Sequence, residues 1–126
     1  MKLTRRNRKF VVGTKKKITL KDVGSLYLKN NENITIVNKN KKKEYDICKK
    51  SWGFYGTPSL NKRLTKFGYK AALVKNRKFN TYTILIVDTD KKYNFYKYLR
   101  SQSIFIVCWF DNKNLLNIEK FFKIKK

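Results

Sequence analysis

The chain has 126 residues, of which 32 are Lys or Arg, eight are Asp or Glu and none is His, so its formal net charge is +24. Such a one-sided charge opposes compaction through self-repulsion, which argues against a free-standing enzyme and indicates a polyanionic partner. Without His, Ser-His-Asp and Cys-His catalytic arrangements are excluded, and a zinc site would have to use carboxylates. Nine Phe, eight Tyr and two Trp argue against a disordered chain.

One folded domain is the simplest organisation at this length. We expect it to span residues 10–126, after a basic N-terminal arm over 1–9. The start of the chain has no apolar segment of the secretory type, and the longest apolar run, 104–110, is much too short to span a bilayer. We therefore expect a protein of the cytoplasm or of an organelle matrix, without a membrane partner, whose two cysteines stay reduced.

The arm over residues 1–9 concentrates arginine. Three of the six arginines in the chain lie between positions 5 and 8. A genome rich in A and T could explain much of the lysine content, but it does not explain an arginine cluster. Guanidinium groups bind phosphate through paired hydrogen bonds and stack on bases. We expect phosphate contacts from Arg5, Arg6, Arg8 and Lys9; the alternative is a solvated tail.

Residues 10–48 have the alternating pattern of short strands. The clearest strand covers 33–37, and a second one at 44–48 follows a polar stretch that is rich in lysine. Two strands separated in this way predict a β-hairpin. Its tip carries Lys41, Lys42 and Lys43, which either are solvated or reach into RNA.

Residues 51–70 carry the most distinctive pattern in the chain. Thr57 followed by Pro58 predicts a helix start, and Gly68 predicts its end, so we expect a helix over 58–67. The unpaired N–H groups and the positive dipole end at such a start favour a phosphate ligand. Trp52 and Phe54 are expected in the core, whereas Tyr55 is either a core residue or a platform for an unpaired base.

The candidate nucleic-acid residues of this segment supply a close backbone approach, hydroxyl groups, positive charge and one aromatic ring. A basic turn further along the chain could join the same face. The full set is Tyr55, Gly56, Thr57, Ser59, Lys62, Arg63 and Lys66, with Arg77 and Lys78 from the turn.

The second half of the chain predicts a strand at 81–87, a helix at 91–100 that buries Tyr96 and Leu99, and an apolar strand at 103–110. This spacing favours a parallel pair of strands with the helix on one sheet face. Asp88 and Asp90 are expected to cap the helix. An amphipathic helix follows at 114–124. The expected fold class is α+β: an N-terminal antiparallel β-sheet region, then a β-α-β layer and a C-terminal amphipathic helix.

These patterns favour an RNA-binding protein, a ribosomal or ribosome-associated component that clamps the phosphates of RNA, with rRNA and neighbouring ribonucleoprotein subunits as partners. The alternative is a small enzyme or regulator that binds a phosphorylated metabolite or nucleotide at the helix start near Thr57. A third reading is a protein-interaction module that uses the C-terminal helix. No catalytic residue, cofactor or metal site is predicted, and enzymatic activity is not expected.

Overall fold

The computed structural model describes residues 1–39 and 43–123. Contacts divide the chain into two compact units, Met1–Pro58 and Ser59–Lys126. These bounds differ from the arm over 1–9 and the single domain over 10–126 that the sequence suggested. The difference at the N-terminus arises because the basic residues form a strand within the first unit. Lys41 and Lys42 lie outside the described residues.

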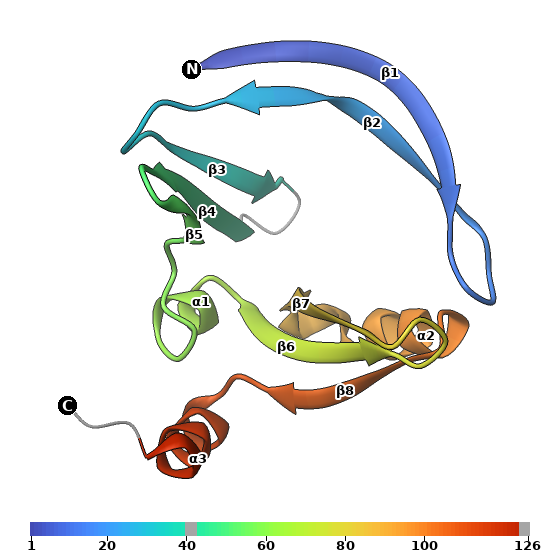
Figure 1. The fold of residues 1–126 in the computed structure, drawn as a ribbon, viewed down its shortest axis with the longest axis vertical. Helices are drawn as coiled ribbons and strands as arrows, with labels where there is room; N and C mark the ends of the chain where they lie inside the picture. The colour runs from blue at the N-terminus through green and yellow to red at the C-terminus, as the bar shows by residue number, and fades with distance from the viewer. Residues whose placement is uncertain (40–42, 124–126) are drawn as a thin grey trace. The chain divides into compact units, whose positions relative to one another are not determined.

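The first unit begins with a long hairpin, drawn in blue in Figure 1, in which β1 (Lys2–Val12) pairs antiparallel with β2 (Ile18–Tyr27). Phe10 lies opposite Leu20 on the two strands, and cross-strand apolar pairs of this kind stabilise a ribbon. The register shifts between Arg5 and Arg8, which is a β-bulge. Every residue of β1 is exposed. Strands β1 and β2 pack extensively only on each other.

A three-stranded antiparallel sheet completes the first unit, in the order β3 (Asn33–Asn38), β4 (Lys43–Lys50) and β5 (Gly53–Gly56). The predicted hairpin over 33–48 is therefore confirmed. On the central strand Asp46 is buried, and its carboxylate accepts a hydrogen bond of 2.6 Å from the Thr35 hydroxyl. Cys48, also buried, lies two residues further along β4.

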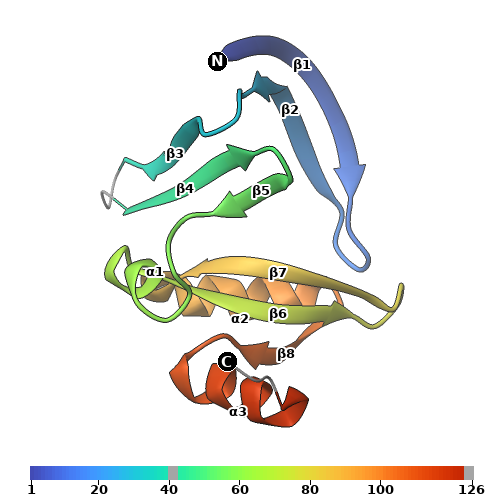
Figure 2. The same ribbon diagram turned by 60° about the vertical axis from the view of Figure 1, so that its left-hand side comes forward.

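The second unit contains an antiparallel sheet in the order β7-β6-β8, formed by β6 (Tyr69–Asn76), β7 (Thr81–Asp88) and β8 (Ile104–Trp109). Figure 2 shows α2 (Lys92–Ser101) running behind β6 and β7. The core lies between this helix and one face of the sheet, and comprises Ala72, Val74, Val87 and Leu99 with Leu85, Phe95, Ile104, Ile106 and Trp109 packed against them.

Two details of the predicted β-α-β layer are corrected. Strands β7 and β8 run in the same direction, but they are not hydrogen-bonded neighbours, because β6 lies between them and pairs antiparallel with both. Tyr96 is 40% exposed rather than buried, and Phe95 packs on the core in its place. Leu99 is buried as predicted.

Side chains cap the 3-10 turn before α2 and the last helix of the second unit, whereas the N-cap residue of α2 itself, Lys91, makes no side-chain cap. Asp88 caps the 3-10 turn η1 (Thr89–Lys91), where its Oδ1 accepts the Asp90 N–H at 2.9 Å. Asp111 caps α3 (Asn112–Phe122), where its Oδ1 accepts the Asn114 N–H at 3.0 Å. The α+β class, with an antiparallel N-terminal sheet region and a C-terminal helix, is confirmed. Within the described part of the chain, no helix is long and apolar enough to cross a membrane.

Candidate nucleic-acid interface

Positive charge covers the β1–β2 hairpin. Residues 1–27 contain nine Lys and Arg side chains and one acidic side chain, Asp22. Lys9 lies directly opposite Lys21 on the paired strands, although like charges in this arrangement destabilise a ribbon. At the tip, Lys15 and Lys16 are exposed, and Lys17 donates to the Gly13 carbonyl at 3.1 Å. The ribbon therefore offers a surface on which cationic side chains far outnumber the single acidic one.

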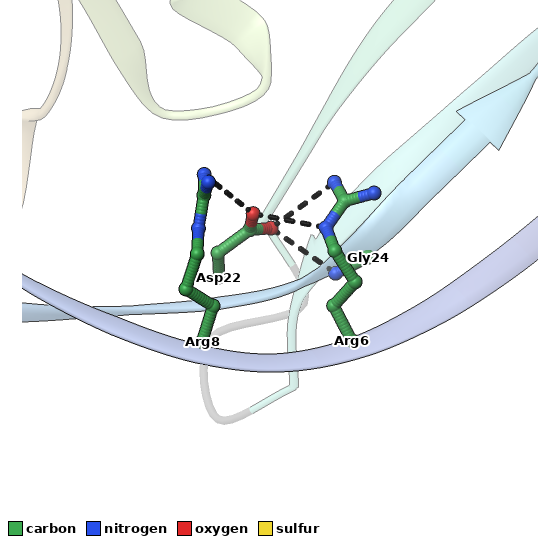
Figure 3. A network of polar contacts seen from close by, with 4 residues as sticks. All are labelled: Arg6, Arg8, Asp22 and Gly24. Carbon is green, nitrogen blue, oxygen red and sulfur yellow. Dashed lines mark hydrogen bonds and ion pairs between the residues drawn. The ribbon is translucent and has the colours of Figure 1, made fainter.

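Asp22 forms ion pairs with two of the three clustered arginines, as Figure 3 shows. Its Oδ2 lies 3.0 Å from Arg6 Nε and 3.0 Å from Arg8 Nη2, and its Oδ1 accepts the Gly24 N–H at 3.2 Å. The hydrogen bond from Arg6, with the Gly24 N–H and the charges of both arginines, holds the pKa of the Asp22 carboxyl below its ordinary value. The carboxylate thus fixes both guanidinium groups on the ribbon.

Three aromatic side chains lie exposed around β5, and we call Trp52, Phe54 and Tyr55 the aromatic edge. Trp52 is 71% exposed and Phe54 is 64% exposed, so the expectation that both fill the core is wrong. Tyr55 is exposed as well. Because neighbouring strand residues point to opposite faces, Phe54 and Tyr55 present their rings on different sides of the sheet.

A lysine ammonium group lies near each of the two rings of the aromatic edge that belong to β5. Lys49 Nζ lies 5.6 Å from the Phe54 ring centroid, and Lys50 Nζ lies 5.9 Å from that of Tyr55. Trp52 stacks on Tyr55 at a centroid distance of 6.0 Å and an interplanar angle of 25°. Rings that stay in water next to cations can stack on bases while the cations meet phosphates.

Gly56 and Thr57 serve the first unit in a different way from the one predicted. The space that a Gly56 side chain would occupy is filled by the phenol of Tyr45. The Thr57 N–H donates to the Asp46 carbonyl at 3.0 Å, which extends the pairing of β5 with β4. Thr57 therefore ends a strand instead of capping a helix, and the predicted helix start is wrong.

The helix that was expected over 58–67 is a single turn, α1 (Arg63–Lys66), in the second unit. Ser59 already satisfies the backbone at its start, since its Oγ accepts the Arg63 N–H at 3.0 Å and its carbonyl accepts the Leu64 N–H at 3.0 Å. Lys62 and Lys66 are exposed on the surface. The first N–H groups of α1 itself are thus bonded within the chain.

The other candidate residues lie on separate elements. Arg77 and Lys78 occupy the turn between β6 and β7 in the second unit, and Lys43 begins β4 in the first. Sequence reasoning missed Lys21, whose position opposite Lys9 depends on the strand register. It also missed the exposure of Trp52 and Phe54, for which the preceding lysine pair, Lys49 and Lys50, was the available signal.

No protein-family model, curated protein or solved structure matched the chain in comparisons with each. Across residues 1–39 and 43–123, no three His, Cys, Asp or Glu side chains gather in a group that could hold a metal ion. The charged ribbon and the exposed rings are therefore the features that indicate a function.

Proposed function

We propose that the chain binds RNA, as a ribosomal or ribosome-associated component whose β1–β2 hairpin lies against RNA phosphates. The observation that carries the proposal is the hairpin itself. Every residue of β1 is exposed, and residues 1–27 have nine cationic side chains and one carboxylate. Phosphate neutralisation by such side chains dominates the affinity of proteins for RNA.

The hairpin has physical reasons to need a partner. An isolated two-stranded ribbon is marginally stable in water. Here Lys9 and Lys21 face each other across the strands, and the nearby Val11 is 61% exposed. A phosphate group between the two ammonium groups would turn their repulsion into attraction. The same contact would also order the ribbon, whose first strand is exposed along its whole length.

The aromatic edge favours single-stranded RNA over a double-stranded ligand. In RNA-binding proteins, exposed rings stack on unpaired bases that loops and ends can splay out, whereas the bases of a duplex stay stacked on one another. Trp52 and Phe54 are exposed in water beside cations, a combination that binds single strands. We further propose that the protein works in the cytoplasm or an organelle matrix, on rRNA and among neighbouring ribonucleoprotein subunits. The alternative of a metabolite site is not proposed, because no helix begins at Thr57.

A charge-matched pair of triple variants tests the role of the hairpin. Replacing Arg5, Lys9 and Lys21 by Gln removes three charges from the ribbon but leaves the Asp22 network intact. Replacing Lys97, Lys113 and Lys120 by Gln removes three charges from helices of the second unit. Fluorescence polarisation with a labelled single-stranded RNA should show a much larger loss of affinity for the hairpin variant. Equal losses would contradict a specific role of the hairpin.

A further inference from the structure

A row of three side chains crosses the sheet of the second unit. Lys75 on β6 lies in register with Tyr82 on β7 and with Phe105 on β8. Residues that face one another across antiparallel strands project on the same side of a sheet. The order across the sheet is therefore ring, ammonium, ring, and we call Tyr82, Lys75 and Phe105 the sheet row.

The sheet row lies on the face that α2 does not cover. The neighbouring residue, Val74, is buried in the core beneath α2, and side chains alternate between faces along a strand. Tyr82 is 59% exposed, and Ile84, two residues along β7, is 57% exposed. Lys75 and Phe105 are half-buried, so the row is partly open to solvent, and none of its three residues belongs to the hydrophobic core.

Cations lie beside the rings of this face. Lys75 Nζ lies 5.0 Å from the Tyr82 centroid, and Arg77 Cζ lies 4.6 Å from the Phe105 centroid. At the β6–β7 turn, Lys78 Nζ lies 5.5 Å from the ring of Phe79, which is 60% exposed. The sequence has no Asp or Glu from 69 to 87 or from 101 to 110. The charge of this face therefore complements a polyanion.

Specific hydrogen bonds hold the turn that carries Arg77 and Lys78. The Asn76 side-chain oxygen accepts the N–H groups of Lys78 at 3.0 Å and of Phe79 at 3.1 Å. The Arg77 N–H donates to the Ser103 carbonyl at 3.0 Å, which ties the turn to the residues before β8. A fixed turn holds the rings and cations in place before a ligand arrives, which lowers the ordering cost of binding.

We propose that the sheet row and its turn form a second, independent site, which takes unpaired bases of single-stranded RNA. Bases stack on Tyr82 and Phe105, and Lys75, Arg77 and Lys78 contact the flanking phosphates. Aromatic side chains on an open sheet face bind two or three bases in this way in other RNA-binding proteins. The inference rests on the proposed function, and it adds a second site for single-stranded RNA that does not include the aromatic edge.

Photo-crosslinking separates the two sites, because trypsin places them on different peptides. The aromatic edge falls in residues 51–62, whereas Tyr82 and Phe105 fall in 79–91 and 101–113. The full chain is irradiated with a single-stranded RNA that contains 4-thiouridine, digested and analysed by mass spectrometry. We expect crosslinks in 79–91 and 101–113 that a duplex of the same sequence does not give. Crosslinks confined to other peptides would overturn the second site and leave RNA binding standing.

A conservative variant tests the stacking itself. Tyr82→Leu keeps an apolar side chain but removes the ring, and Tyr93→Leu makes the same change at a 74% exposed position on α2. Loss of one stacked base should weaken the binding of single-stranded RNA by about five- to 150-fold. The Tyr93 variant should bind like the unmodified chain, and an abasic ribose-phosphate strand should not distinguish the two variants.

The outcomes of these measurements are separable. If the unmodified chain binds neither the single strand nor the abasic strand, the proposed function fails. If it binds the single strand, but Tyr82→Leu binds as well as Tyr93→Leu, the second site fails alone. If this face serves to bind a protein and not RNA, the crosslinks to 79–91 and 101–113 are absent while RNA binding persists, which also contradicts the inference.

Discussion

Arg6 Nε lies 3.0 Å from Asp22 Oδ2, so the one acidic side chain of residues 1–27 is bonded to an arginine of the facing strand. Arg8 binds the same oxygen at 3.0 Å. Asp22 thus orders the two guanidinium groups on the ribbon and also competes with any phosphate for them. Both effects can be measured.

Asp22→Asn should strengthen RNA binding. The change removes a negative charge and releases Arg6 and Arg8 for phosphate contacts. The dependence of log K on log salt should steepen by about 0.7 for each new phosphate contact on a single strand. Weaker binding by this variant in polarisation assays would mean that the carboxylate positions the arginines for RNA, and that its competition with phosphate is secondary.

RNA affinity should not change between about pH 5 and 7, because the chain has no His. The pKa of Asp22 is lowered in the folded hairpin, chiefly by the hydrogen bond from Arg6. The stabilisation from this carboxylate is therefore present above its unfolded value of 3.8 and is lost only as the pH falls through the lower folded value. Hydrogen exchange of the β1 amides across an acid series measures the loss, and a midpoint near neutrality would contradict it.

Gly56→Ala should destabilise the first unit, because the added methyl group meets the phenol of Tyr45. Overpacking of this kind costs about 1–3 kcal/mol in the free energy of unfolding, which chemical denaturation measures. Tyr45→Phe in the same chain removes the hydroxyl and should restore part of the loss. If Gly56→Ala is as stable as the unmodified protein, the packing of Tyr45 on this glycine is wrong.

Replacing both Lys62 and Arg63 by Ala should weaken RNA binding no more than replacing Lys97 and Lys113 does. The backbone N–H groups of Arg63 and Leu64 are already bonded to Ser59, so only the general charge is lost. A much larger loss for the first pair, measured at equal salt, would show that this segment binds phosphate after all.

Local patterns predicted the elements whose structure depends on neighbours in the sequence. Asp88 caps the turn before α2, as the sequence predicted, through a short-range hydrogen bond to the Asp90 N–H. The same rules failed at Thr57, because its N–H is taken by the carbonyl of Asp46, eleven residues away in the sequence. A cap signal does not reveal a competing strand partner.

The arrangement of the candidate site residues depends more on how distant strands align than on local sequence patterns. Residues 1–9 have no clear alternation, and they form a strand only because β2 pairs with them across the bulge. The pairs Lys9 with Lys21 and Lys75 with Tyr82 follow from strand alignment alone. The exposure of Trp52 was signalled only by the preceding lysine pair, and rings of this size usually fill cores.

The salt dependence of RNA affinity tests the central claim most directly. The unmodified chain is titrated with a labelled single-stranded RNA from low to moderate salt, beside an abasic strand of equal length. We predict a linear fall of log K with log salt for both strands, and tighter binding of the strand that carries bases at every salt concentration. An affinity that does not change with salt, or no binding at low salt, would contradict the account.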